Sequence, residues 1–496
     1  MAPARPRRLP TAVHRSVPRP RPGTRRRPQP WSSSSLESGR GVRAMVRRTS
    51  HSVKHLAGSS PARTALTAFA LVGGFFTVLL TLPFAARDGH HTPLHDAMFT
   101  AVSAVSVTGL TTVNTAEHWS TLGHVIILVA IQIGGLGILS MASLLTLAVS
   151  RHLGVRSKLL TQEGGMTTGN VGEVGKLLRV VVVTVLTAEL ILTALMAPRF
   201  IAEAGSVGRG LWHAVFYAVS AFNNAGFSLH PDGLESFAHE PYLLTVIAVG
   251  VFIGALGFPV VLVLMQTGWR YSRWNLHTKI TVEVTLILLV LGAVFIWVFE
   301  RTNPNTLAPM GGGEQIGQSL FASVMTRSGG FSVIDVNAQT SETLLLTDAL
   351  MFVGGGSAST AGGIKVTTLA VMFLAIVAEA RGDKEVTVHG RTIASETLRV
   401  AIAVLALGAT LVLVATLVVL AMTTEQLQRP LFEVISAFAT CGLSTGLSAE
   451  LPPAGAYVLT AMMFAGRVGT ITFAAALALR QRRVLYRYPV ERPILG

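Results

Sequence analysis

The sequence predicts an all-α integral membrane protein built from four helix–pore loop–helix repeats around one central pore. Three observations support this class. One twelve-residue pattern occurs four times, apolar segments of spanning length flank each copy, and 50% of the 496 residues are hydrophobic whereas 13% are charged. A pattern that recurs at a similar interval indicates repeated structural units. We therefore expect eight transmembrane helices and four re-entrant half-helices.

The repeated pattern ends each time in glycine followed by leucine or phenylalanine. Its copies read FTAVSAVSVTGL at 99–110, FYAVSAFNNAGF at 216–227, LFASVMTRSGGF at 320–331 and FEVISAFATCGL at 432–443. The eleventh position is always glycine: Gly109, Gly226, Gly330 and Gly442. The fifth position is serine in three copies: Ser103, Ser220 and Ser436. Because the copies align without gaps, they predict four-fold quasi-symmetry about an axis within one chain.

The apolar segments on both sides of each copy predict the spanning helices. A helix needs about 20 apolar residues to cross the bilayer core. Segments of at least this length lie at 64–86, 122–150, 177–200, 242–268, 278–299, 343–380, 397–422 and 454–479. The copies between them are too short to cross and are expected to be half-helices. The resulting repeats are 61–155, 156–272, 273–388 and 389–496. A soluble protein with buried core helices is the alternative, which this number of long apolar segments disfavours.

The distribution of charge predicts the orientation in the membrane. Lysine and arginine concentrate in the connections at 151–179, 269–279 and 381–391 and after residue 480, whereas the opposite connections carry more acidic residues. Lysine and arginine accumulate on the cytoplasmic side of membrane proteins. We therefore expect a multi-pass protein of the cell (plasma) membrane with both termini in the cytoplasm. The glycine-bearing loops then enter from outside.

The first 60 residues are predicted to be a disordered, basic cytoplasmic tail. Residues 1–54 hold 14 lysine or arginine residues and one acidic residue, Glu37. Such a composition cannot bury enough apolar surface to fold. Contact with anionic membrane lipid is favoured over nucleic-acid binding, and a translation start at Met45 is a third interpretation. No secretory signal is expected, and the single cysteine, Cys441, excludes a disulfide within the chain.

The repeated glycines predict a filter for cations. A cation that crosses a bilayer exchanges its hydration shell for equivalent ligands, and a ring of backbone carbonyls supplies them. Glycine allows the backbone conformations that turn successive carbonyls toward one axis. Each half-helix ends near its glycine, so the negative end of its dipole faces the place where a cation would sit. One glycine match would be weak, but four in register between spanning segments are a strong signal.

Specific motifs add a resemblance to a known family. They are TGL at 108–110, FNNAGF at 222–227, RSGGF at 327–331, CGL at 441–443, GGGSASTAGGIK at 354–365, GRVGT at 466–470 and RYPVERPILG at 487–496. Over roughly 60–496 the chain resembles the Trk/Ktr/HKT superfamily of potassium transporters, and within it the Ktr-type membrane subunit. Two features depart from the usual pattern, namely Ser328-Gly329 in the third copy and the long basic tail.

The resemblance implies potassium as the transported ion, sodium as a candidate activator, and no cofactor bound by this chain. It also implies a homodimer, helped by residues 488–496, on a cytoplasmic KtrA-like nucleotide-binding regulatory ring. The residues expected to form the potassium selectivity filter are Val107, Thr108, Gly109, Asn224, Ala225, Gly226, Ser328, Gly329, Gly330, Thr440, Cys441 and Gly442.

A gate is expected beneath this filter. Every inner helix contains glycines midway, but only the one at 343–380 is expected to be broken by a long loop. Arg467 lies midway along the last apolar segment, where a charged residue is costly and marks a functional site. Lys365 follows the loop and either joins the gate or extends to the cytoplasm. The expected gate residues are Gly354, Gly355, Gly356, Ser357, Ala358, Ser359, Thr360, Ala361, Gly362, Gly363, Lys365 and Arg467.

The sequence excludes several other functions. It has no phosphate-binding glycine-lysine motif and no cysteine–histidine metal pattern, so no enzyme is expected. The alternative to a potassium filter is a secondary transporter of another monovalent cation or small solute. Such transporters typically show inverted repeats with helices broken in matched pairs. The repeats here all run in the same direction with one expected break, which favours the filter.

Overall fold

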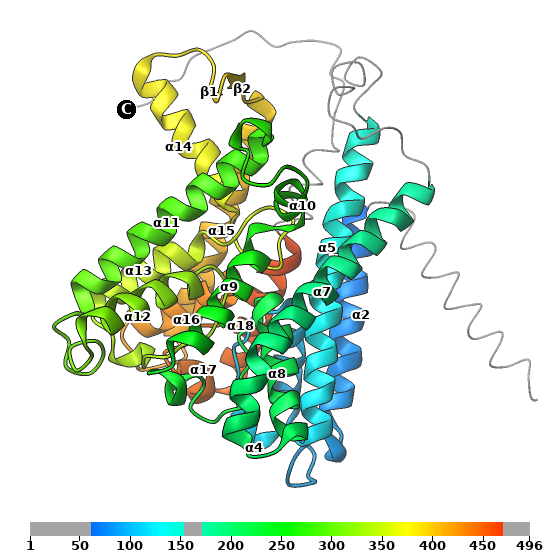
Figure 1. Ribbon diagram of the computed structural model, residues 1–496, viewed down its shortest axis with the longest axis vertical. Coiled ribbons are helices and arrows are strands. Elements are labelled where there is room, and N and C mark those ends of the chain that lie inside the picture. Colours follow the sequence, from blue (N-terminus) through cyan, green and yellow to red (C-terminus); the bar gives the residue numbers. More distant parts are fainter. Residues whose placement is uncertain (1–60, 153–170, 470–496) are drawn as a thin grey trace, which may run out of the picture. The chain divides into compact units, whose positions relative to one another are not determined.

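The structure is a computed structural model that describes residues 61–152 and 171–469 (Figure 1). The basic tail expected at 1–60, the connection at 153–170 and the chain from residue 470 lie outside the described residues. The expectations for the tail and for the C-terminal dimerisation segment therefore stay predictions.

The helices follow one another in the order outer helix, half-helix, inner helix. The outer helices are α2 (Pro61–Thr81), α7 (Val171–Ala204), α11 (Leu276–Glu300) and α15 (Ser395–Leu420). The half-helices are α3 (Leu94–Ser106), α8 (Val207–Phe222), α12 (Gly312–Met325) and α16 (Gln428–Ala439). The inner helices are α5 (Thr121–His152), α9 (Pro241–Leu256) with α10 (Phe258–Thr267), α13 (Ser341–Phe352) with α14 (Val366–Arg381), and α18 (Pro453–Phe464) with the π turn η6 (Ala465–Gly469). Each half-helix packs against the outer helix that precedes it.

Neighbouring units contact one another in a closed cycle. The first inner helix α5 packs against α7 and α8, and α9 packs against α11 and α12. In the same way α13 packs against α16, and the last inner helix α18 packs against the first half-helix α3. In Figure 1, α5 and α7 run side by side while α16 and α18 lie among the other units. The half-helices of all units are thereby brought toward a common centre.

Apolar side chains on the outer helices are exposed, as expected for surfaces in contact with lipid. Examples are Leu71 on α2, Leu190 on α7, Val290 on α11 and Leu413 on α15, each more than half exposed. Three described helices are long and apolar enough to cross a membrane: Leu178–Ala204, Leu276–Glu300 and Ser395–Leu420. The bent pair α9 and α10 makes a fourth when it is counted as one span. The expected count of eight spanning helices stays a prediction.

The first position of the repeated pattern anchors each half-helix in the core. Phe99, Phe216 and Phe432 are fully buried. In the third copy the first position is Leu320, which is exposed, and Phe321 at the second position is buried instead. The third half-helix therefore turns a different face toward the core, although its glycine stays in register with the others.

The inner helix expected at 242–268 is broken, which corrects the expectation of a single interruption in the third repeat. Helices α9 and α10 meet at 102°, and Gly257 between them has a φ of 92°. A Cβ on Gly257 would lie 2.6 Å from the carbonyl oxygen of Ser357, so the 354–363 loop passes directly beside the break. The loop also takes up the backbone groups that the break frees: the Gly356 amide donates to Ala255, and the Phe258 amide donates to Ala358. Sequence reasoning missed this break, although Gly257 followed by Pro259 at the start of α10 is a local signal for one.

Short elements connect the long helices. They are η1 (Pro83–Ala85), α4 (Thr115–His118), η3 (Glu235–Phe237), η4 (Tyr271–Arg273), η5 (Val336–Ala338) and α17 (Leu447–Glu450). A two-stranded antiparallel ribbon, β1 (Thr387–Val388) and β2 (Arg391–Thr392), joins the third unit to the fourth. This ribbon is a small addition to the predicted all-α class.

Candidate ion filter and intramembrane loop

The four repeated glycines meet in a ring. A Cβ on Gly109 would lie 2.2 Å from the carbonyl oxygen of Ala225, and one on Gly226 would lie 2.8 Å from Cα of Gly330. A Cβ on Gly330 would lie 2.7 Å from the carbonyl oxygen of Cys441. One on Gly442 would lie 2.2 Å from the carbonyl oxygen of Thr108, which closes the cycle. Real side chains do not tolerate such distances, so each of these positions requires glycine.

The same pattern of positive φ angles occurs in all four glycine segments, which we define as residues 107–109, 224–226, 328–330 and 440–442. The residue two before each glycine has a positive φ, although none of these residues is glycine. The angles are 57° at Val107, 61° at Asn224, 65° at Ser328 and 46° at Thr440. Each ring glycine also has a positive φ. A non-glycine residue in this region is uncommon and is costly for β-branched valine and threonine, so the surrounding structure must hold it there.

The serine at the fifth position of the pattern holds the glycine segment in place. The hydroxyl oxygens of Ser103 and Ser436 each accept a hydrogen bond of 3.1 Å from the amide of the glycine six residues later. The Ser220 hydroxyl instead donates to the carbonyl of Phe227 at 3.0 Å. The third copy has Val324 here and lacks the hydroxyl. The serines were noticed in the sequence, but their role follows only from the structure.

Hydrogen bonds also connect neighbouring glycine segments. The Asn224 side chain donates to the carbonyl of Arg327 at 3.4 Å, and the Ser328 hydroxyl donates to the carbonyl of Ala439 at 3.1 Å. The Cys441 thiol lies 3.4 Å from the carbonyl oxygen of Met325. These contacts join the second, third and fourth units at the ring itself. Asn224, Ser328 and Cys441 therefore fix the geometry of the ring.

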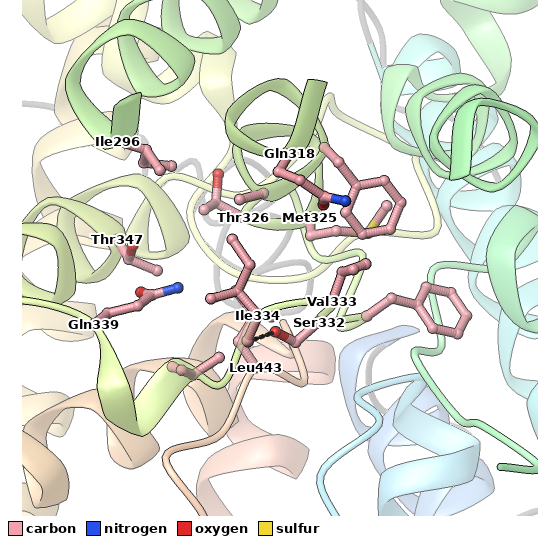
Figure 2. Close-up of a pocket in the computed structure, with 14 residues that line it drawn as sticks. Ile296, Gln318, Met325, Thr326, Ser332, Val333, Ile334, Gln339, Thr347 and Leu443 are labelled. Atoms are coloured by element: carbon pink, nitrogen blue, oxygen red, sulfur yellow. Dashed lines mark hydrogen bonds between the residues drawn. The ribbon is translucent and has the colours of Figure 1, made fainter. Parts of the chain in front are cut away.

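A small cavity lies beside the third segment, outside the ring (Figure 2). It is lined by Ile296 of α11, Gln318 and Met325 of α12, Thr347 of α13, and Leu443 of the fourth unit, among others. The Ser332 hydroxyl, on the chain leaving Gly330, turns back to the carbonyl of Ile334. No residue that lines this cavity is charged. The ring formed by the four glycine segments is therefore the better candidate site for a cation.

The 354–363 loop packs against the ends of two half-helices. Its neck is closed by a bridge between Val353 and Ile364. Within it, the Thr360 hydroxyl donates to the side-chain oxygen of Asn224 at 2.7 Å. A Cβ on Gly362 would lie 2.1 Å from the hydroxyl oxygen of Thr440. The loop therefore touches the second and the fourth glycine segments directly.

Three cationic side chains surround this loop, of which Arg327 and Arg467 are buried and Lys365 is partly buried. The Arg467 guanidinium donates to the carbonyl of Thr360, and its other two nitrogens have no hydrogen-bond partner among the described residues. The Lys365 ammonium donates to the carbonyl of Ala361 at 2.6 Å. The Arg327 guanidinium donates to the carbonyl of Val353 at 2.9 Å, at the neck of the loop. Lys365 thus faces the loop, and Arg327 holds the residue at which the loop begins.

Arg467 lies on an irregular turn, not on a continuous helix as the sequence suggested. Helix α18 ends at Phe464, and residues 465–469 form a π turn. A Cβ on Gly466 would lie 1.7 Å from the carbonyl oxygen of Phe438, so the backbones of this turn and of α16 are in contact. π turns often occur at functional sites because they shift side chains out of the helical register.

Comparison with known proteins identifies the family. The model of a cation transport protein family, TrkH, matches residues 51–484. The chain belongs to this family. A potassium uptake protein B of the Ktr system from Vibrio alginolyticus is 36% identical over 84% of this chain and 91% of its own length, and that of Bacillus subtilis is 36% identical over 84% and 94%. A potassium/sodium uptake protein of Enterococcus hirae, NtpJ, is 35% identical over 88% of this chain and 97% of its own length.

A solved structure agrees with the fold. The potassium transporter TrkH from Vibrio parahaemolyticus superimposes with a TM-score of 0.64, covering 82% of this chain and 84% of its own, at 19% identity. The predicted family and the all-α membrane class are therefore confirmed. As a member of a cation transport family with several apolar helices, the chain is a multi-pass membrane transport protein and not an enzyme.

One buried carboxylate near the ring of this TrkH-family chain was missed in the sequence. Glu189 of α7 is 6% exposed and accepts hydrogen bonds from Asn223 at 2.9 Å and from Gln132 at 3.1 Å. Asn223 immediately precedes the second glycine segment. The signal was available, because Glu189 is an acidic residue inside the apolar segment 177–200, just as Arg467 is a basic one in the last segment.

Proposed function

We propose that this chain mediates potassium uptake across the plasma membrane through a filter formed by the four glycine segments. The observation that carries the proposal is the closed ring of Gly109, Gly226, Gly330 and Gly442. The names of the relatives in Vibrio alginolyticus and Bacillus subtilis support potassium as the ion. The proposed filter residues are those of the four segments, with potassium held by their backbone carbonyls.

Carbonyl oxygens replace the hydration shell of the ion as it enters the ring. The half-helices α3, α8, α12 and α16 end at these segments, so their negative dipole ends favour a cation there. The membrane potential supplies the driving force, since one charge gains about 2.3 kcal/mol per 100 mV. This chain then needs no bound cofactor for inward transport.

The 354–363 loop and Arg467 act as the gate in this proposal. The loop blocks the path below the ring, and the guanidinium adds a positive charge that repels cations. A cytoplasmic KtrA-like nucleotide-binding ring opens the path by moving the loop through helix α14, which begins directly after Lys365. The loop has two neighbours whose rearrangement would accompany opening, namely the bend at Gly257 and the π turn.

We also propose a homodimer with both termini in the cytoplasm. Residues 488–496 contribute to the contact between copies. Removing these nine residues is expected to shift the detergent-solubilised protein toward the monomer, as measured by light scattering. An unchanged mass would exclude the segment from the interface.

Sodium remains a second candidate ion, favoured by the name of the Enterococcus hirae relative, a potassium/sodium uptake protein. Sodium is proposed here as an activator, and permeation by sodium is the competing function. Potassium and sodium would pass through the same ring in the competing function, so the ratio of potassium flux to sodium flux would depend on the geometry of that ring.

Uptake of ⁸⁶Rb⁺ into liposomes that contain only this chain tests the proposal. A membrane potential that is negative inside the liposomes should drive Rb⁺ accumulation. External potassium should inhibit this uptake, and external sodium should inhibit it much less. The experiment is run with and without sodium to separate activation from permeation. Equal competition by sodium would support the second candidate, and no uptake by folded protein would reject both.

A further inference from the structure

One cluster of potential metal ligands lies outside the ring and the loop. It combines Glu203 at the end of α7, His213 on α8 and His230 on the chain that follows the second glycine segment. One ligand atom of each residue lies within 4.8 Å of the others. The sequence gives no hint of this cluster because its members come from three separate elements.

The orientation of His230 suits a metal ligand. Its Nδ1 is hydrogen-bonded to the Tyr217 hydroxyl at 2.6 Å, and its Nε2 lies 3.0 Å from a carboxylate oxygen of Glu203. Histidines that bind metals almost always use the second ring nitrogen in such a hydrogen bond, which fixes the ring and its tautomer. Tyr217 is itself fully buried and also bonds to the Ser228 hydroxyl. These two contacts therefore hold Nε2 of His230 toward Glu203.

His213 supplies an independent observation. Its Nδ1 is buried and has no hydrogen-bond partner among the described residues. Its ring lies 5.1 Å from the ring of His230, edge to face, and 6.0 Å from Phe200. A buried polar nitrogen without a partner is uncommon and calls for an explanation such as an ion that the site accepts.

We propose that Glu203, His213 and His230 bind a transition-metal ion of the Zn²⁺ type. Two imidazoles and one carboxylate form a donor set that suits Zn²⁺, with water completing the tetrahedron, whereas Mg²⁺ and Ca²⁺ prefer oxygen ligands alone. A bound ion would join the end of α7, the half-helix α8 and the chain four residues beyond Gly226. The second glycine segment would then be restrained on both sides.

Zn²⁺ titration of the full-length chain in detergent, after chelator treatment, tests this site. The wild type should bind one Zn²⁺ per chain saturably and show a rise in melting temperature, with no competition from excess Mg²⁺. His213→Ala should weaken binding by at least about tenfold. Tyr217→Phe, which keeps all three ligands and removes the hydrogen bonds of this hydroxyl to His230 and Ser228, should weaken it by about tenfold.

His90→Ala is the matched control, because His90 is an exposed histidine paired with Asp88. It should leave Zn²⁺ affinity unchanged. Co²⁺ in place of Zn²⁺ gives a second readout that does not depend on stability, since its visible absorption reports a low coordination number with nitrogen ligands. Equal Zn²⁺ affinity of wild type and folded His213→Ala, or binding that does not saturate at one ion per chain, would overturn the proposal and leave Glu203 and His230 as an ion pair.

Discussion

The four glycine segments share one backbone conformation, whereas the four inner helices that follow them all differ. Every segment has a positive φ two residues before its glycine and another at the glycine. Among the inner helices, α5 is continuous over its described residues, the second is bent at Gly257, the third is interrupted by the 354–363 loop, and the fourth changes to a π turn at Ala465. The four repeated units thus have similar backbone geometry at the ring, and they differ in the inner helices.

This difference separates two physical requirements. In the proposed filter, a spherical ion on an axis would need equivalent ligands from every side, which would account for the shared geometry of the four segments. A gate must have two states, and a loop that breaks the symmetry can take up a second position without moving the whole ring. The irregular elements all contact the loop or lie next to it, so the proposed gate involves one region of the molecule and not four.

The largest effect is expected from substitution in the ring. Gly109→Ser places a side chain where a Cβ would already be 2.2 Å from the Ala225 carbonyl, and Gly330→Ser meets the Cys441 carbonyl at 2.7 Å. The displaced carbonyls should lower the Rb⁺/Na⁺ uptake ratio by about tenfold, equal to about 1.4 kcal/mol. Gly109→Ser should be the more severe of the two, because its Cβ is closer to the neighbouring carbonyl.

Gly137→Ser is the control for these variants, since a Cβ on Gly137 meets nothing within 4 Å. It should retain the wild-type uptake ratio. A ratio unchanged in Gly109→Ser or in Gly330→Ser would refute the equivalence of the four segments that the comparison rests on.

The next effect concerns the loop. Deletion of residues 357–362, or Arg467→Ala, should raise basal Rb⁺ flux in the absence of the cytoplasmic partner by severalfold, because the obstruction and the positive charge are removed. Arg467→Lys keeps the charge and should stay close to the wild type. Flux is measured per folded molecule, since Arg467 also connects helix and loop. If neither removal increases flux while the folded yield falls, the guanidinium is only a structural bridge.

A smaller effect is expected from the fifth-position serine. Ser436→Ala removes the acceptor of the Gly442 amide and should lower stability by about 1 kcal/mol, with a modest loss of potassium preference. The third repeat provides the internal comparison, because Val324 already stands at this position. Val324→Ala should therefore leave the uptake ratio unchanged. A similar loss of preference in both variants would show that packing, and not the hydroxyl, holds the segment.

The ring residues could be located from the sequence because the pattern that encodes them is local. A half-helix, a left-handed residue and a glycine lie within twelve positions, and four copies in register exclude coincidence. The bend at Gly257 was missed, although IGALGF at 253–258 is followed directly by Pro259, which IGGLGI at 133–138 in the continuous helix α5 lacks. The contacts of Ser357 and Ala358 with this bend could not be predicted, since they come from another repeat.

The hydrogen-bond partners of single buried residues could not be predicted from the sequence. The charge of Glu189 in an apolar segment was visible, but its hydrogen bonds to Asn223 and Gln132 join two helices and a half-helix. Arg467 is the exception, since it was grouped with the 354–363 loop in the expected gate and does contact Thr360 of that loop. The π turn that carries Arg467 depends on the close approach of Gly466 to Phe438, which no local pattern specifies.

Thr360 has a consequence for thermodynamic linkage. Its hydroxyl is bonded to Asn224 in the second glycine segment, while its carbonyl accepts the Arg467 guanidinium. One residue therefore belongs at once to the ring and to the loop below it. If an ion in the proposed filter shifts Asn224, the free energy of the loop conformation shifts with it, and by reciprocity a partner that moved the loop would change the ion affinity of the ring by the same factor.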